Sequence, residues 1–214
     1  MIVIHKDYVY NPEESRRGIG RILMGHSRLD KQKTHERIVA IASQRLRERG
    51  LEGIGVADLM KEAGLTVGGF YKHFASRDDL VAEAVQSAFG SWGRKLADQG
   101  IKPADLSLSE VAANYMSPHH RDGPGDGCPF PALTADLARS GPQARAIATA
   151  RLKENLETFE GRVSGEGSAV KRKKAIVAFS VMAGAVGLAR VVDDEALSLE
   201  ILEAVKEFVT SLGE

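Results

Sequence analysis

Apolar side chains recur every three to four residues along most of the chain, which is the spacing that places them on one face of an α-helix. The first clear case ends at Arg49, where Ile38 and Leu46 share an apolar face. Gly50 follows and favours a helix stop. No segment shows the sustained alternation that is typical of a β-strand. The pattern therefore predicts an all-α fold, with helices near residues 34–49, 56–63, 67–73, 77–96, 108–117, 130–139, 143–163, 169–192 and 198–212.

The second and third of these helices are short and are separated by a turn of three to four residues that contains Gly64. This is the arrangement of a helix-turn-helix, whose second helix enters the major groove of DNA. Phe70 and Phe74 stand one turn apart and are predicted to pack inward together. Thr66 and Ser76 are predicted to cap the third and fourth helices.

The third helix has an unusual composition for a purely structural element. Gly68 and Gly69 each cost about 1 kcal/mol relative to alanine inside a helix, which indicates that another molecule must approach the backbone closely. The alternative is that the two glycines form a tight packing joint within the protein. Around them lie side chains that can donate hydrogen bonds to phosphate: Thr66, Tyr71, Lys72, His73 and Arg77. Val67 can contact a thymine methyl group.

The stretch from Thr66 to Phe74, followed by Ser76-Arg-Asp-Asp-Leu80, resembles the TetR family of one-component transcriptional regulators over about residues 34–85. The resemblance implies a three-helix DNA-binding domain and a helical regulatory domain that holds a ligand cavity and dimerises through the last two helices. It implies DNA contacts at Thr66, Gly68, Tyr71, His73 and Arg77, and operator preference at Val67, Gly69 and Lys72. Gly55 departs from the pattern, because many members have Thr or Ser there.

Three regions follow from the helical pattern and the resemblance together. Residues 1–29 lack a helical period and are predicted to form a flexible N-terminal arm. Met24 is a second plausible start, so residues 1–23 are either a natural arm or a start-site artefact. Residues 30–77 are predicted to form the helix-turn-helix domain, and residues 78–214 the regulatory and dimerisation domain.

Charge is distributed unevenly along a chain whose 29 basic and 29 acidic residues give no net charge. Residues 16–77 hold 13 Lys and Arg against 6 Asp and Glu, a net +7, which favours a polyanion partner. The single cysteine excludes an internal disulfide. No secretory signal is evident, which predicts a cytoplasmic protein. The apolar run Ala175–Ala189 is shorter than the roughly 20 residues of a membrane span, so a buried core or interface helix is preferred.

The C-terminal half is expected to sense a small molecule and to form a homodimer. Small residues at Ala178, Gly184, Ala185 and Ala189, and the apolar face of residues 201–209, are candidates for the dimer interface. An apolar effector cavity is expected in this half. The candidate lining residues are aromatic or apolar side chains: Trp92, Tyr115, Met116, Phe130 and Phe159.

Cys128 lies in a glycine-rich loop that runs into a helix, where a helix N-terminus lowers a thiol pKa. It is either a sensor of oxidants or electrophiles or an inert small side chain. His119 and His120 precede it, but neither a metal site nor a cofactor is expected. No nucleophile–base motif, P-loop or dinucleotide fingerprint occurs, so no catalytic residue and no enzyme activity are expected.

The sequence therefore predicts a cytoplasmic regulator, more often a repressor than an activator. It binds a palindromic double-stranded DNA operator as a dimer and is released by an unidentified small molecule or by modification of Cys128. Two alternatives stay open: a helical protein-interaction adaptor with non-specific DNA binding, and an enzyme that depends on the Cys128 thiol. The effector, the operator and the regulated genes are not encoded in any readable motif.

Overall fold

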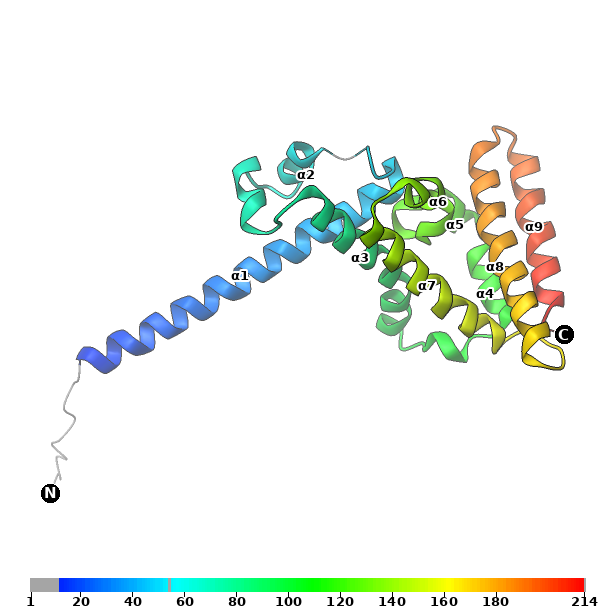
Figure 1. Cartoon of the computed structure of the whole chain (residues 1–214), viewed down its shortest axis with the longest axis horizontal. Coiled ribbons are helices and arrows are strands. Elements are labelled where there is room, and N and C mark those ends of the chain that lie inside the picture. The colour runs from blue at the N-terminus through cyan, green and yellow to red at the C-terminus, as the bar shows by residue number, and fades with distance from the viewer. Residues whose placement is uncertain (1–11, 54, 214) are drawn as a thin grey trace, which may run out of the picture. The chain divides into compact units, whose positions relative to one another are not determined.

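The structure is a computed structural model that describes residues 12–53 and 55–213, with side chains from Arg28 onward. Every regular element in these residues is helical, so the predicted all-α class is confirmed (Figure 1). The elements are α1 (Pro12–Arg49), α2 (Val56–Glu62), η1 (Val67–Lys72), α3 (Arg77–Asp98), η2 (Pro103–Asp105), α4 (Leu108–Tyr115), α5 (Pro118–Asp122), η3 (Pro124–Asp126), α6 (Pro129–Arg139), α7 (Pro142–Glu160), α8 (Ser168–Val191) and α9 (Glu195–Ser211).

Helix α1 begins far earlier than the pattern predicts. The predicted start near Thr34 is wrong, because the backbone is helical from Pro12. Proline fits the first helical position, where a missing N–H removes no hydrogen bond, and interior glycines weaken a helix without breaking it. The predicted arm at residues 1–29 is therefore helical over its described part, and residues 1–11 lie outside the described residues. By its internal contacts the chain divides into Met1–Arg37 and Ile38–Glu214.

Most other helices lie within a few residues of their predicted positions. The predicted start of the last helix at Ser198 is late, because Asp194 accepts hydrogen bonds from the N–H groups of Ala196 and Leu197 and starts α9 at Glu195. The short α5 was not predicted, and Ser117 caps it. The predicted domain boundary after residue 77 stays a prediction, since it falls within the unit that starts at Ile38.

One hydrophobic cluster joins the helix-turn-helix to the start of the regulatory half. It contains buried side chains of α1 from Ile38 on, of α2, η1 and α3, and also Leu133 and Leu137 of α6 and Ala144 and Ala148 of α7. Helices α6 and α7 therefore pack on the same core as the helix-turn-helix.

A second cluster fills the C-terminal half around α8, with contributions from α4, α7 and α9. Phe130 packs against both clusters and so links them. Helix α8 is long and apolar enough to cross a membrane by length and composition alone. Its buried residues are members of this cluster, as expected of a core helix: Ala175, Ala178, Phe179, Met182, Ala185, Val186 and Ala189.

Candidate functional site

The turn between α2 and η1 is closed by backbone hydrogen bonds. Gly64 adopts a positive φ of 69°, and its N–H donates to the Lys61 carbonyl at 3.0 Å. The N–H of Leu65 then donates to the Met60 carbonyl at 2.8 Å, so the chain reverses and presents η1. The predicted third helix at residues 67–73 is a 3₁₀-helix, Val67–Lys72, rather than an α-helix.

The orientation of η1 is determined by Phe70. Its side chain is only 1% exposed, and its ring lies 5.4 Å from the ring of Phe74, so the predicted inward pair is confirmed. The opposite side of η1 carries Val67 at 51% exposure and Tyr71 at 76%. An aromatic side chain this exposed on a short, firmly anchored segment is typical of a contact surface.

The eight predicted DNA-binding residues fall into two groups. Those on the exposed face of the segment are Thr66, Val67, Gly68, Tyr71 and Lys72. Gly69, His73 and Arg77 are partly buried. An N–H of Arg77 Nη2 donates to the Leu51 carbonyl, and the same nitrogen lies 3.7 Å from Glu52 Oε2, so this side chain also holds the loop before α2.

Capping of the helices around η1 differs in part from prediction. The predicted cap by Thr66 is wrong, because its side chain makes no cap hydrogen bond, and Gly55 likewise provides none for α2. Ser76 Oγ accepts from the N–H of Asp79 at 3.1 Å, so the predicted cap of α3 is confirmed. The side chain of Thr66 remains exposed at the start of η1.

The protein's own packing does not explain the two adjacent glycines. A Cβ atom at Gly68 would have no heavy atom within 4 Å, and one at Gly69 would make an ordinary contact of 3.6 Å with Met60. Neither residue has a positive φ. The alternative of a tight internal packing joint is therefore not supported, and the space beside Gly68 is open to an external molecule.

Helix α2 is fixed to α1 by a two-pronged ion pair. Arg45 Nε and Nη2 donate to the two carboxylate oxygens of Glu62 at 3.0 Å and 2.6 Å. The same guanidinium donates to Glu48 at 2.5 Å. Planar pairing of this kind fixes orientation as well as distance, so it sets the angle at which α2 presents the turn and η1.

In the regulatory half, aromatic rings form a continuous row. The ring of Phe130 on α6 lies 4.9 Å from Phe89 and 5.4 Å from Phe179, and Phe179 lies 5.8 Å from Phe159. Of the residues predicted to line an effector cavity, Phe130 and Phe159 belong to this row. Trp92 is 39% exposed on α3 and takes no part in these ring contacts.

Cys128 stands at the N-terminus of α6, as predicted, but its thiol is not activated there. Burial raises the pKa of the Cys128 thiol, and this outweighs the lowering by the Tyr115 hydroxyl and by the backbone N–H of Phe130. Its backbone N–H donates to His120 Nε2 at 2.9 Å. The role of Cys128 as a redox sensor stays a prediction.

His120 is held as the neutral tautomer by two backbone groups. Because Nε2 accepts from the Cys128 N–H, the proton lies on Nδ1, which donates to the Tyr115 carbonyl at 2.7 Å. Burial lowers the pKa of His120 below 6.5. No group of three His, Cys, Asp or Glu side chains able to hold a metal ion occurs in the part of the chain that the structure describes.

The stability of the protein is expected to fall as the pH decreases from 7.5 through 6.5 toward the lowered pKa of His120. The unfolded chain binds a proton at His120 in this range and the folded chain does not, so folding is weakened until both are protonated. Melting temperatures of the wild type and His120→Gln measure this at each pH. His119→Gln, at the exposed neighbouring residue, is the control and is expected to retain the wild-type pH dependence. Identical curves for all three proteins contradict the assignment.

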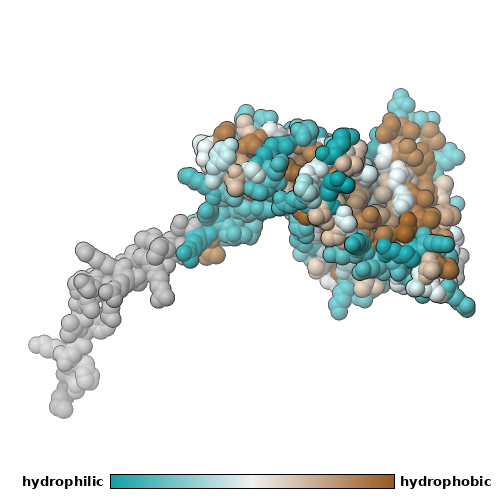
Figure 2. Space-filling view, in the orientation of Figure 1, coloured by the Kyte–Doolittle hydropathy of each residue, from teal (hydrophilic) through white to brown (hydrophobic). Residues whose placement is uncertain are grey.

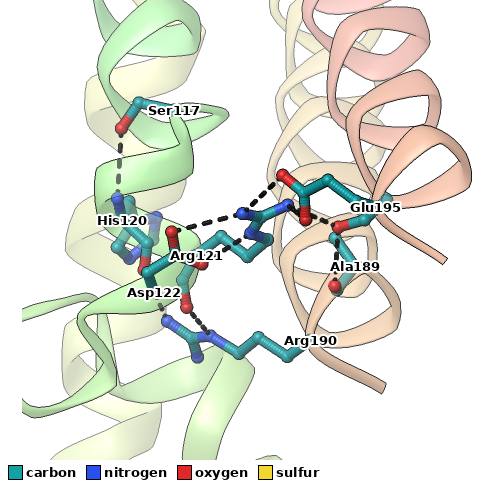
Figure 3. Close-up of polar contacts among 8 residues, drawn as sticks. Ser117, His120, Arg121, Asp122, Ala189, Arg190 and Glu195 are labelled. Atoms are coloured by element: carbon teal, nitrogen blue, oxygen red, sulfur yellow. Dashed lines mark hydrogen bonds and ion pairs between the residues drawn. The ribbon is translucent and has the colours of Figure 1, made fainter. Parts of the chain in front are cut away.

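Two arginines that the sequence reasoning missed connect α5 to α8 and α9 (Figure 3). Arg121 donates to Asp122 at 2.7 Å, to Glu195 at 3.0 Å and to Ser198 at 2.9 Å. Arg190, at the end of α8, donates to the backbone carbonyls of Arg121 at 2.8 Å and His120 at 2.7 Å. A lone arginine at the end of a long apolar run was the available signal for Arg190.

The structure also ties the end of α1 to the loop before Cys128. Arg47 on α1 is 6% exposed, and its Nη1 donates to the Gly127 carbonyl and to Ser91 Oγ, both at 2.9 Å. Burial lowers the pKa of Arg47. Gly125 lies so close to Glu48 that a Cβ atom there would stand 2.5 Å from the carboxylate.

The segment that contains the exposed surface matches a known family. Residues 38–84 match the family described as bacterial regulatory proteins, tetR family. The chain therefore carries a TetR-family DNA-binding domain over these residues. An uncharacterised HTH-type transcriptional regulator of Mycobacterium tuberculosis is 28% identical to this regulator over 166 residues. The match covers 73% of this regulator and 84% of the relative. This regulator is therefore a DNA-binding transcription factor rather than an enzyme.

Solved structures agree in fold. A TetR-family regulator from Cytophaga hutchinsonii has a TM-score of 0.70 at 18% identity, covering 86% of this regulator and 96% of that chain. FadR from Bacillus subtilis, in complex with stearoyl-CoA, has a TM-score of 0.58 at 19% identity, covering 82% and 97%. The predicted order of an N-terminal helix-turn-helix and a C-terminal helical domain is confirmed.

Proposed function

We propose that this regulator is a cytoplasmic repressor that binds a palindromic double-stranded DNA operator as a homodimer and is released by a small-molecule effector. The observation that carries the proposal is the exposed face of η1, which Phe70 anchors from behind. Tyr71 and Lys72 extend from this face, and Gly68 leaves open space beside it. These features suit close approach to a groove wall.

The proposed DNA contacts are of two kinds: contacts to phosphates, which position the protein on the duplex, and contacts to bases, which recognise the sequence. Thr66, Tyr71, Lys72 and His73 are assigned to phosphate oxygens, which set register and give salt-dependent affinity. Val67 is assigned to a thymine methyl group. Gly68 and Gly69 admit the backbone of η1 to the groove. Arg77 is assigned to phosphate, together with the N-terminus of α3, while its bond to the Leu51 carbonyl limits how far it can reach.

The dimer is assigned to α8 and α9. Apolar side chains are exposed on both helices, and brown surface gathers over this end of the molecule (Figure 2). These side chains are Val170, Ile176, Val177, Leu188, Val191, Leu197, Leu199 and Phe208. Ala178, Ala185 and Ala189 are buried within their own chain, so only Gly184 of the predicted small residues is exposed. A two-fold pair of such faces suits a palindromic operator.

The effector is assigned to the regulatory half, where the row of Phe89, Phe130, Phe179 and Phe159 provides an apolar wall. FadR, which shares the fold, is known in complex with stearoyl-CoA. Binding acts by population shift, favouring a spacing of the two η1 segments that no longer matches adjacent major grooves. Complete reversal from 99% bound to 99% released needs about 5.5 kcal/mol of differential affinity.

Selection of bound sequences from a random duplex pool tests the proposal. Purified full-length protein at physiological salt is expected to recover a palindrome. Recovery of DNA without a motif by folded protein would instead favour the non-specific adaptor. Turnover of a thiol-reactive substrate that Cys128→Ser abolishes would favour the thiol-dependent enzyme.

Replacing Gly68 by Ala is expected to weaken operator binding at least about tenfold while leaving stability unchanged or raised by up to about 1 kcal/mol. The added methyl group meets no protein atom, so any loss reports contact with DNA. Fluorescence anisotropy and thermal unfolding measure the two effects. Gly93→Ala on α3 is the matched control, because its Cβ also meets nothing within 4 Å. Wild-type affinity in Gly68→Ala contradicts the assignment of this face.

A further inference from the structure

Two buried polar atoms in the regulatory half have no oxygen or nitrogen hydrogen-bond partner: Tyr115 Oη at the end of α4 and Arg190 Nη1 at the end of α8. The Tyr115 hydroxyl interacts with the Cys128 thiol, which is only a weak acceptor. Both residues contact His120, because the Tyr115 ring packs against its ring and Arg190 Nη2 donates to its carbonyl, so the two atoms belong to one neighbourhood. Buried polar groups without partners are rare, and each calls for a physical explanation.

Both side chains are held in place by α5 rather than loosely packed. Arg190 uses Nε and Nη2 on the carbonyls of Arg121 and His120, which leaves Nη1 as the unused donor (Figure 3). The ring of Tyr115 lies edge-on to the ring of His120, with centroids 4.5 Å apart. The donors are thus preorganised, which lowers the entropy lost when a ligand binds.

The charge of Arg190 lacks a close counter-ion. Among the residues that the structure describes, no carboxylate oxygen lies within 4.0 Å of its guanidinium, whereas Arg121 pairs with both Asp122 and Glu195. A guanidinium has donors only, and a phenol hydroxyl can donate as well. What this position lacks is an acceptor, and an anionic acceptor also compensates the charge of Arg190.

The surroundings indicate what carries that acceptor. Tyr115 and Phe130 pack against the same hydrophobic cluster, and Phe130 belongs to the aromatic row. On its other side, Arg190 helps to line an open cleft of about 260 Å³ together with Arg121, Asp122 and Glu195. A ligand with a polar end near Arg190 and an apolar body near Phe130 would therefore match the two sides of this region.

We propose that the effector is an organic acid whose carboxylate accepts hydrogen bonds from Tyr115 Oη and Arg190 Nη1, and whose apolar or aromatic body lies toward Phe130. This rests on the effector response proposed above and specifies its ligand class. Arg190 supplies charge and Tyr115 supplies a second, directional donor. A neutral amide of the same shape presents a weaker acceptor and brings an N–H group toward the guanidinium, so it is selected against.

The experiment uses matched pairs of probes with the full-length protein. Each acid is compared with its primary amide: 2-naphthoate with 2-naphthamide, and decanoate with decanamide. Isothermal titration calorimetry and thermal shift are expected to show that at least one acid binds at least about tenfold more tightly than its amide. If no acid binds, or if acids and amides bind equally, the carboxylate assignment is wrong.

Tyr115→Phe separates recognition from folding. Because Oη loses only a weak interaction with the Cys128 thiol, the variant is expected to stay close to the wild-type melting temperature and to bind the preferred acid about tenfold more weakly, with its amide unaffected. Arg190→Gln is expected to lower acid affinity further. Tyr71→Phe, which removes a phenol hydroxyl from η1, is the control and is expected to retain wild-type acid affinity. Undiminished acid affinity in Tyr115→Phe overturns the proposal.

Release of operator DNA by the same probes distinguishes failure of this inference from failure of the proposed function. Release by acids but not by amides supports both. Tight acid binding that depends on Tyr115 without DNA release supports the carboxylate site and overturns the effector response. Release by acids and amides alike keeps the effector response and overturns the carboxylate assignment.

Discussion

Replacing Phe70 by Ala is expected to lower the free energy of unfolding by about 3–5 kcal/mol and to abolish operator binding. Phe70 is one of the largest fully buried side chains, and it packs on Phe74 while the rest of η1 is exposed. Its loss leaves a cavity and removes the anchor of the contact surface. Thermal or denaturant unfolding measures the first effect, and anisotropy with labelled operator measures the second.

Val67→Ala is the matched control for Phe70, since Val67 lies on the exposed side of the same short helix. Its unfolding free energy is expected to stay within about 0.5 kcal/mol of the wild type. Operator preference is expected to change at one base pair in each half-site, because the thymine contact is lost. Equal stability of Phe70→Ala and the wild type would show that Phe70 does not anchor η1.

Arg47→Met is expected to lower the free energy of unfolding by about 2 kcal/mol and to reduce the response of DNA binding to the effector. The Gly127 carbonyl and Ser91 Oγ lose their donor, while methionine relieves part of the cost of burying a charge. The bond to Gly127 joins α1 to the loop that leads into Cys128 and α6. Without it, movement at the effector site is passed less completely to α1.

Unfolding by urea, and operator release by an acid that binds the wild type, measure the two effects of Arg47→Met. Arg49→Met is the control, since Arg49 is exposed two residues further along the same helix. It is expected to match the wild type in both measurements. A stable Arg47→Met variant with a normal effector response would show that the hydrogen bonds of Arg47 neither stabilise the fold nor couple the effector site to α1.

The helix-turn-helix was largely predictable because its signals are local. The turn at Gly64, the inward pair of Phe70 and Phe74, and the cap at Ser76 each depend on residues within one or two turns of one another. The 3₁₀ form of η1 was not predictable, because six residues held between a turn and a buried ring follow tertiary packing more than helix propensity.

The polar site of the regulatory half was only partly predictable, because its contacts span the sequence. Tyr115 was singled out as an aromatic candidate, but the burial of its hydroxyl without an oxygen or nitrogen partner arises only when α4, α5 and α8 are packed together. Arg190 and Arg47 donate to backbone carbonyls far along the chain. Every residue has a backbone carbonyl, so the amino-acid sequence does not show which one an arginine binds. Trp92 illustrates the opposite difficulty: it is 39% exposed, and because a large apolar side chain does not by itself indicate a cavity, its assignment stays a prediction.

The partly buried Cys128 gives the protein an intrinsic reporter of its regulatory half. It is the only cysteine in the chain, so a neutral thiol reagent labels one position without any engineering. Cys128 is partly buried and burial raises the pKa of its thiol, so little thiolate is present at neutral pH and labelling is expected to be slow. Comparing the labelling rate with and without operator DNA therefore shows whether DNA binding changes the surroundings of the start of α6.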